Sequence, residues 1–316
     1  MKKLISILMA LTMLLGAFPA MAEQATYTVG ICQLVSHDAL DAATQGFMDA
    51  VKEDLGDSVT FDLQNAAGDS NTCSIIANDF VSNNVDLILA NSTPALQSAS
   101  AATADIPILG TSVTEYGVAL GIKDFSGTVG GNISGTSDLA PLDKQAAMVK
   151  ELFPDAKNVG LIYCSAEANS QYQVDVVKVY LEELGYTCTL YPFSDSNDAS
   201  AVIQTAADSS DVIYTPTDNT VASNGAIVDN ICQPAEVPVV AGEEGSANSF
   251  GVAALAISYY DLGFTTGKMA VKILTGEEDI STMPVAYAEK STAKYNPIIC
   301  ENLGVTVPEN YIPIGK

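Results

Sequence analysis

The chain has 316 residues, with 38 acidic and 13 basic side chains and a formal net charge of −25. Such an acidic surface argues against binding to nucleic acid or to an anionic membrane, and it favours solubility. The sequence contains neither Arg nor Trp, and its one His is His37. A ligand carboxylate must therefore be bound by backbone N–H groups, hydroxyls, amides or Lys, because no guanidinium is present to donate two parallel hydrogen bonds.

The first 22 residues predict export. Lys2 and Lys3 precede an almost wholly apolar run from Leu4 to Leu15, and Ala20-Met21-Ala22 supplies the small residues of a signal-peptidase site. The apolar run is short for a bilayer span, and no Cys near the cleavage site is available for a lipid anchor. We expect cleavage after Ala22 and a soluble protein in the periplasm or another extracytoplasmic space.

The mature chain begins with β-prone segments that alternate with helical patterns. We expect strands at Tyr27–Val35, Val59–Leu63, Val85–Ala90 and Ile106–Gly110. We expect helices from about Asp38, over Ser70–Ser82 and after Pro94. Val85–Ala90 is apolar throughout, as a strand covered on both faces should be.

The same rhythm restarts after the glycine-rich segment 127–135, which we interpret as a hinge. Later strands are expected at 159–163, 187–191, 212–214 and 237–241, and helices at 141–153, 174–184, 199–207, 221–232 and 259–274. Two rounds of alternating strands and helices predict an α/β fold of two doubly wound parallel-sheet lobes with a ligand cleft between them. The expected division is 23–137 with about 252–284 for the first lobe, and 138–251 with about 285–316 for the second.

Ligands of such sheets bind at the carboxyl ends of the strands, so the loops there are candidates for a site. In the first lobe these loops contain Gln33, Leu34, His37, Asn91, Ser92, Thr93, Thr111, Ser112 and Val113. In the second lobe they contain Glu167, Asn169, Asp218, Asn219 and Glu243.

The two sets of loops differ in chemical character. Ser92 and Thr93 precede a helix that Pro94 begins well, and the free N–H groups of a helix N-terminus suit a carboxylate. The alternative is that they only cap the helix. Asp218 and Glu243 are acids that suit an ammonium group, although a single loop acid is more often solvated. Donors on one lobe and acids on the other predict a zwitterion held between them.

Catalytic and metal motifs are missing from the sequence. His37 stands beside Ser36 and Asp38, but neighbours in sequence rarely form a catalytic triad, and no G-x-S-x-G motif is present. The six Cys show no C-x-x-C spacing, and disulfides and buried thiols are equally compatible with the pattern. We expect no enzyme activity, no cofactor and no metal.

Segments spread over nearly the whole mature chain resemble the substrate-binding components of ABC importers with the type I periplasmic-binding-protein fold, and among them the tryptophan/tyrosine-type family. They are VGICQLVSHDALDAATQGFMDA (29–50), ANSTPALQSA (90–99), ILGTSVT (108–114), GGNISGTSD (130–138), SAEANSQ (165–171), TPTDNTVAS (215–223), VVAGEEG (239–245) and AISYYDLGFTTGKMAVKIL (256–274). The resemblance implies capture of a solute by two lobes joined by three strands, and docking of the closed form on a membrane permease.

The resemblance also implies roles for particular residues. Ser92, Thr93 and Ser112 would bind the carboxylate of a free, aromatic amino acid, and Asp218 its ammonium group. The rest of the site would be lined by Gln33, Asn219 and Glu243, with Tyr116, Tyr163 and Tyr172 as ring contacts on position alone. The alternatives are the same fold with a branched-chain amino acid, a nucleoside or a sugar, or an exported hydrolase. We expect a monomer.

Overall fold

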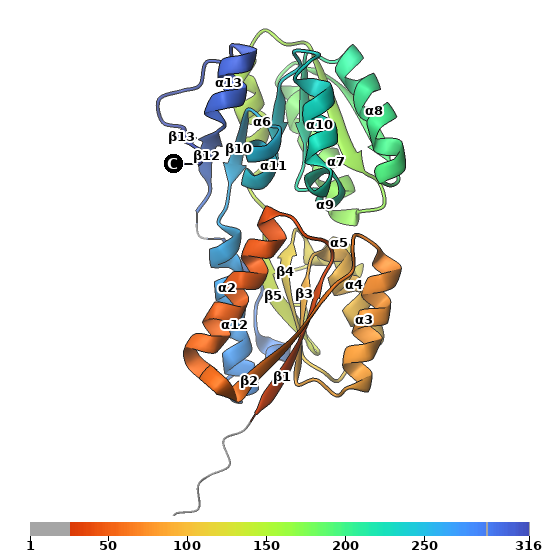
Figure 1. Cartoon of the computed structure of the whole chain (residues 1–316), viewed down its shortest axis with the longest axis vertical. Coiled ribbons are helices and arrows are strands. Elements are labelled where there is room, and N and C mark those ends of the chain that lie inside the picture. The colour runs from red at the N-terminus through yellow and green to blue at the C-terminus, as the bar shows by residue number, and fades with distance from the viewer. Residues whose placement is uncertain (1–25, 289, 316) are drawn as a thin grey trace, which may run out of the picture.

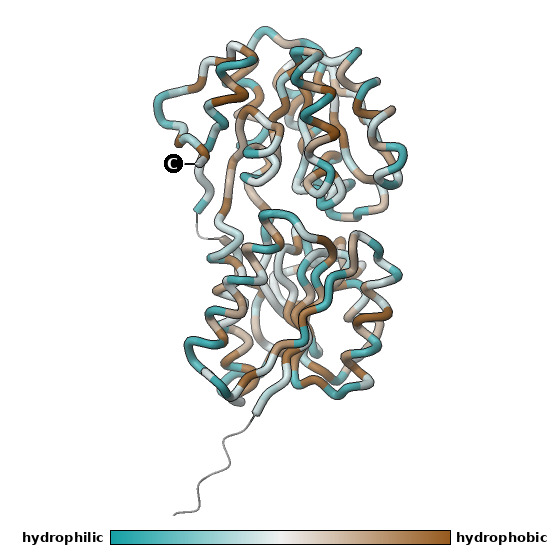
Figure 2. The backbone as a smooth tube through the Cα atoms, viewed as in Figure 1, coloured by the Kyte–Doolittle hydropathy of each residue, from teal (hydrophilic) through white to brown (hydrophobic). Residues whose placement is uncertain are grey.

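The computed structural model describes residues 26–288 and 290–315, and the expected signal peptide lies outside them. Within this part of the chain the strands form two sheets, and each sheet is the centre of its own lobe (Figure 1). Apolar segments run through the middle of each lobe, whereas hydrophilic segments lie on the outer helices and loops (Figure 2). The prediction of two doubly wound α/β lobes is confirmed.

The sheet of the first lobe is parallel throughout. In spatial order its strands are β11 (Ala286–Tyr287), β5 (Ile133–Ser137), β4 (Ile108–Val113), β3 (Leu87–Asn91), β1 (Tyr27–Gln33) and β2 (Val59–Asn65). Its helices are α2 (Asp38–Leu55), η1 (Gly56–Ser58), α3 (Ser70–Ser82), α4 (Thr93–Ala102), α5 (Tyr116–Leu120), α12 (Tyr259–Leu274) and η2 (Ile280–Thr282). Side chains alternate along β1, so that Val29 and Ile31 pack with α2 and α12, and Cys32 packs with α3 and α4.

The sheet of the second lobe contains one antiparallel pair. In spatial order its strands are β13 (Ile312–Pro313), β12 (Thr292–Tyr295), β10 (Ala253–Ala256), β9 (Val239–Ala241), β8 (Val212–Thr215), β6 (Asn158–Cys164) and β7 (Thr187–Phe193). Its helices are α6 (Leu142–Leu152), α7 (Ala168–Glu183), α8 (Ser196–Ser209), α9 (Asn219–Ser223), α10 (Gly225–Cys232), α11 (Glu244–Ser249) and α13 (Pro297–Leu303). β10 and β12 run antiparallel, and the other neighbours are parallel.

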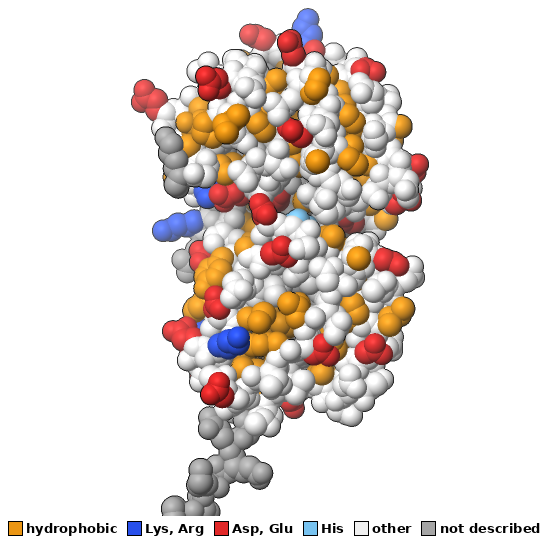
Figure 3. Space-filling view, in the orientation of Figure 1, with side chains coloured by type: hydrophobic (Ala, Val, Ile, Leu, Met, Phe, Trp, Pro, Cys, Tyr) orange, Lys and Arg blue, Asp and Glu red, His pale blue; other side chains and the backbone are white. Residues whose placement is uncertain are grey.

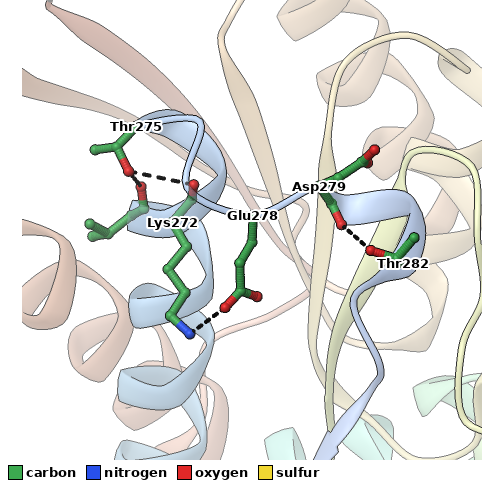
Figure 4. Close-up of polar contacts among 6 residues, drawn as sticks. Lys272, Thr275, Glu278, Asp279 and Thr282 are labelled. Carbon is green, nitrogen blue, oxygen red and sulfur yellow. Dashed lines mark hydrogen bonds and ion pairs between the residues drawn. The ribbon is translucent and has the colours of Figure 1, made fainter.

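Helix α12 packs on the first lobe although it follows a strand of the second. Two glycines of α12 permit this, because a Cβ on Gly263 would overlap the backbone of Ala43 in α2, and one on Gly267 would lie 2.6 Å from the Cβ of Ala50. In the last turn of α12, Lys272 Nζ pairs with Glu278 Oε1 at 2.7 Å, and beyond the helix the Thr282 hydroxyl donates to the Asp279 carbonyl (Figure 4). These contacts stabilise the turn that leads through η2 to β11.

Three crossings join the lobes. The first follows β5 at Asp138, the second lies between β10 and α12, and the third lies between β11 and β12. The sequence analysis placed the return to the first lobe at about 252 and the final crossing at about 285. The structure shifts both, because β10 pairs inside the second sheet and β11 pairs with β5 inside the first.

The interpretation of 127–135 as the hinge is wrong. Residues from Ile133 onward form β5, a buried strand, and the crossing begins only after it. Gly135 has a φ of +144°, and a Cβ there would overlap the carbonyl of Gly110 on β4. The glycine therefore permits close approach of two strands. The expected helix 221–232 is also divided, into α9 and α10.

Candidate functional site

The carboxyl ends of the strands of both sheets meet in a cleft between the lobes. His37, at the start of α2, hydrogen-bonds across this cleft through Nε2 to Asn219 Oδ1, at the start of α9, over 3.2 Å. The cleft contains a small cavity of about 10 Å³. It is lined by His37, Leu40, Ser112, Thr114, Asp138, Asn169, Thr217, Asp218, Asn219, Ala222, Glu243 and Tyr259. A cavity of this size has room for about one water molecule.

The acids of the second lobe are held by backbone N–H groups at helix N-termini. Asp218 caps α9, with Oδ1 accepting from Val221 N at 2.8 Å and Oδ2 accepting from Cys164 N at 2.6 Å. Glu243 caps α11 and accepts from Gly245 N and Ser246 N. The unpaired N–H groups of a helix N-terminus stabilise a carboxylate, so both acids are fixed in position.

Glu167 is a structural acid of the same lobe. Its Oε1 accepts from Thr220 N and from the Thr220 hydroxyl, both at 2.8 Å, and its Oε2 accepts from Asn219 Nδ2 at 2.6 Å. Both oxygens are thus occupied, and Glu167 is 4% exposed. Glu167 therefore positions Asn219 at the cavity wall and does not line the cavity itself.

Several polar side chains of the first lobe bond to one another. Gln33 donates to the Val35 carbonyl and to Asp41 Oδ1, and its Oε1 accepts from the Thr44 hydroxyl. Asn91 donates to Leu40 O and to the Thr44 hydroxyl. The amide of Gln33 is therefore used inside its own lobe, where it positions the loop before α2.

Ser92 and Thr93 form the start of α4. Ser92 Oγ accepts from Ala95 N at 3.3 Å, the capping role that the sequence analysis set against ligand binding. Both residues are buried, and neither borders the cleft cavity. Thr111 exchanges a hydrogen bond with Thr136 inside the sheet, and Val113 and Leu34 belong to the apolar core.

Three residues at the cavity carry buried polar atoms without a hydrogen-bond partner in the described chain: Ser112 Oγ, Asp138 Oδ1 and Asn169 Oδ1. Burying a polar atom without a partner costs free energy, and such atoms are rare in folded proteins. Ser112 also has a φ of +53°, an unusual conformation for a residue other than glycine. The three atoms mark the place where a polar ligand would complete the hydrogen bonding.

The carboxyls at the cavity are electrostatically unbalanced, because no Lys lines it. Burial, with the nearby charge of Glu167, raises the pKa of Asp218 to about 7. Burial also raises the pKa of Asp138, although the hydrogen bond from Tyr259 opposes the rise. A cation placed among these acids would restore their ionised form.

The structure thus brings together six of the expected contacts, namely His37, Ser112, Asn169, Asp218, Asn219 and Glu243. The three tyrosines considered as ring contacts do not line the cavity. Tyr116 is buried in the first lobe, where its hydroxyl donates to Thr136 O, and Tyr163 is buried in the core of the second. Tyr172 is half-buried and packs against the same second-lobe core.

Sequence reasoning missed Asp138 and Tyr259. Both lie at crossings between the lobes, and the first crossing was expected at 127–135, before Asp138. Tyr259 stands at the first position of the helix expected at 259–274, whereas the candidate loops all follow strands. The available signal was that Asp138 follows a strand directly, as the other candidate loops do.

A larger cavity of about 910 Å³ lies beside the hinge. It is bordered by the starts of α2, α11 and α12 and by the segment around β12. Glu244 and Lys294 pair with each other there at 2.6 Å. The cleft cavity is the better candidate for the ligand site, because the strand ends of both sheets and the unpartnered atoms converge on it.

Other candidate chemistries find no support in the part of the chain that the structure covers. Within residues 26–288 and 290–315, no three His, Cys, Asp or Glu side chains are grouped to hold a metal ion. The six cysteines, all of them in these ranges, form no disulfide. None of the helices described combines the length and the apolarity of a membrane span.

Comparison with known proteins shows the family. Residues 28–313 match the family described as ABC transporter substrate binding protein, and the chain belongs to this family. Its members are solute-binding proteins that work outside the cytoplasm with ABC permeases.

The relatives include proteins with named ligands. Over 266 residues the chain is 39% identical to a "Tyrosine-binding protein" of Clostridioides difficile, covering 83% of this chain and 76% of the relative. A structure from Streptococcus pneumoniae in complex with L-Trp is 32% identical, with a TM-score of 0.86 over 90% of this chain and 97% of that one.

The comparison also defines the arrangement of the lobes. A ligand-free, open substrate-binding protein of Clostridium difficile is 40% identical over 92% of this chain and 99% of that one, yet its TM-score is only 0.69. The shape of the present chain is thus nearer to the L-Trp complex, despite the lower identity. In the present chain the His37–Asn219 hydrogen bond joins the two lobes across the cleft.

Proposed function

We propose that this protein captures a free aromatic amino acid in the cleft between its lobes and presents it to an ABC permease. The observation that carries the proposal is the set of buried acids and the free Ser112 hydroxyl around one cavity. A zwitterion matches both features. The ligands named for the two relatives, tyrosine and L-Trp, support the aromatic class.

The proposed contacts follow from this geometry. Asp218 and its neighbours Asn219 and Glu243 face the ammonium group, and Ser112 binds the carboxylate from the other lobe. Ser92 and Thr93 form the N-terminus of α4, a ten-residue helix, and the partial positive charge of this terminus favours the ligand carboxylate from behind Ser112. Gln33 acts through the loop before α2, since its amide is used within the lobe.

Closure is the mechanism that the structure supports. The cavity is far smaller than an amino acid, so the ligand enters while the lobes are further apart, and the lobes then close around it less tightly than in this arrangement. A ligand then favours closure only to the extent that it binds the closed form more tightly than the open form. Charge-assisted hydrogen bonds from two lobes supply this difference, because they form together only after closure.

A thermal-shift series with the twenty amino acids tests the proposal. We expect the largest rise in melting temperature with Tyr, Trp or Phe, because a ligand at 100 times its Kd stabilises the folded state by about 2.7 kcal/mol. No shift with any amino acid would overturn it. Branched-chain amino acids, nucleosides and sugars serve as competing ligands, and mass spectrometry of copurified material identifies the natural one.

Four finer points belong to the same proposal. We expect the mature protein to begin at Glu23, to be monomeric and to have neither hydrolase activity nor affinity for nucleic acid. Intact-mass measurement of the exported protein, light scattering and an ester or peptide turnover assay check these points. A mature mass that retains residues 1–22 would contradict cleavage after Ala22.

A further inference from the structure

Two of the crossings between the lobes are joined by a buried hydrogen bond. Asp138 is the first residue after β5, on the first crossing, and Tyr259 begins α12 directly after the second. The Tyr259 hydroxyl donates to Asp138 Oδ2 over 2.9 Å. Asp138 is 3% and Tyr259 6% exposed, and both line the cleft cavity. The contact thus lies where the hinge meets the proposed ligand site.

The carboxyl groups around the cavity differ in how their oxygens are used. Both oxygens of Asp218 accept backbone N–H groups, and so do both oxygens of Glu243. Asp138 alone among these three retains a buried oxygen, Oδ1, without a partner in the described chain. An unpartnered buried carboxylate oxygen is costly unless a ligand or water completes its hydrogen bonding.

We infer that Asp138 and Tyr259 form a hinge latch, in which the Tyr259 hydroxyl holds Oδ2 of Asp138 so that Oδ1 receives the ammonium group of the bound amino acid. This inference rests on the proposed function. Tyr259 is a positioning residue, and Asp138 is a ligand contact in addition to Asp218. The latch places the ammonium between an acid of the hinge and the acids of the second lobe.

The latch also couples ligand charge to the hinge. Asp138 and Tyr259 belong to different crossings, so a change in the angle between the lobes alters their 2.9 Å contact. When the contact is broken, Asp138 loses the group that orients it. The ammonium therefore meets a fully oriented carboxylate only in the closed arrangement, which gives the ligand higher affinity for that arrangement.

Calorimetry with L-tyrosine and with 3-(4-hydroxyphenyl)propionate tests the latch. The second compound keeps the ring and the carboxylate but lacks the ammonium group. The wild type should prefer L-tyrosine by about 100-fold or more, as loss of a charge-assisted pair predicts. Asp138→Asn should reduce this preference to about a tenth or less of the wild-type value, and Tyr259→Phe should reduce it about fivefold. Affinity for the analogue should change little.

The neighbouring pair supplies matched controls. Tyr260 donates to Asp49 Oδ2 at 3.1 Å, but this bond joins α12 to α2 and neither residue lines the cleft cavity. Tyr260→Phe removes the same hydroxyl one position away, and Asp49→Asn removes the charge of its acceptor. Both controls should keep the wild-type preference for L-tyrosine within about twofold, since an exposed hydrogen bond contributes little.

The outcomes are separable. A wild-type preference in both Asp138→Asn and Tyr259→Phe would overturn the latch and leave the proposed function intact. A wild type that binds none of the twenty amino acids would overturn the proposed function and the latch with it. Tyr259→Phe removes only one hydroxyl, so its preference decides the question if Asp138→Asn fails to fold.

Discussion

The two lobes share an architecture, but their cleft-facing ends are built differently. In the second lobe, Asp218 and Glu243 cap short helices and receive two backbone N–H groups each. Their carboxyl groups are therefore fixed in position before any ligand arrives, and a bound ammonium group favours their ionised form. Acidic side chains also dominate the charged surface of both lobes (Figure 3), but those are exposed to water. The acids that line the cleft cavity are the two capping residues and Asp138 at the first crossing.

Apart from Asp138 at the first crossing, the first lobe meets the cleft with neutral groups. Gln33, Thr44 and Asn91 hydrogen-bond to one another, whereas the Ser112 hydroxyl, which lines the cavity, has no partner among the described residues. The difference shows how a chain without Arg can bind a zwitterion. One lobe presents carboxyl groups held in position, the other presents donors without charge, and a molecule with both charges links them.

The largest expected effect is loss of the Asp218 carboxyl group. Asp218→Asn should weaken amino-acid binding by about 100-fold, because the ammonium group loses a buried ionised partner. It should also lower the melting temperature by a few degrees, since one of the two N–H groups that Asp218 caps loses its acceptor. Isothermal calorimetry and a thermal melt measure the two effects.

A matched cap elsewhere separates the two effects of that substitution. Asp195 caps α8 through Asn197 N at 2.8 Å and does not line the cleft cavity. Asp195→Asn should affect stability alone. Unchanged affinity in Asp218→Asn would mean that the charge of the second lobe does not contact the ligand.

The next effect is a pH dependence of binding. The pKa of Asp218 is raised to about 7 by burial and by the charge of Glu167, so Asp218 is largely protonated in the ligand-free protein below that pH. Binding of an ammonium group requires the ionised form and releases a proton. Affinity should therefore rise roughly 10- to 100-fold from pH 5 to pH 8. Calorimetry in buffers of different ionisation enthalpy detects the released proton, and a flat profile would contradict the assignment.

The same raised pKa has the opposite consequence for the stability of the empty protein. The unfolded chain ionises Asp218 near its ordinary pKa of 3.8, while the folded protein retains the proton up to about pH 7. The folded state thus binds more protons in this window, and the contribution of Asp218 to stability falls as the pH rises from about 4 to 7. Saturating ligand should remove this loss, which urea titrations at several pH values would show.

The fold was largely predictable because it depends on local patterns. Ser70–Ser82 and Tyr259–Leu274 match their helices residue for residue, since amphipathic periodicity is a property of each segment alone. The crossings were not predictable. Whether Ala253–Ala256 pairs in one sheet or the other depends on distant strands, and a buried Gly135 has the same sequence signature as a flexible hinge.

The sequence predicts which strand ends lie at the candidate site, but it does not predict which side chains at those ends reach the cavity. Ser112 and Asp218 lie at the cavity, as the rule for parallel sheets implies. The rule does not tell which polar side chain at a strand end is already hydrogen-bonded within its own lobe, as Gln33 is to Thr44 and Asp41. Nor does it reach Tyr259, which comes to the cleft from the first turn of a helix.

A smaller effect distinguishes two serines of the first lobe. Ser112→Ala should weaken amino-acid binding about tenfold with little change in stability, because its hydroxyl has no partner within the described protein. Ser92→Ala should instead lower the free energy of unfolding by about 1 kcal/mol, because Ser92 Oγ caps α4. Urea denaturation and calorimetry on both variants test the difference. A stability loss in Ser112→Ala without an affinity loss would make Ser112 structural.

The smallest effect is expected at the end of the first lobe that faces away from the cleft. Lys272 and Glu278 pair at 2.7 Å at the end of α12, but each side chain is 43% exposed, so water screens their attraction (Figure 4). Lys272→Ala should shift the melting temperature by less than about 1 °C and leave amino-acid affinity unchanged. Tyr259 begins the same helix. A change in affinity would therefore mean that a substitution at the far end of α12 alters the hinge. The charges that govern binding would then extend beyond the cleft, and the contrast between buried and exposed acids would no longer account for it.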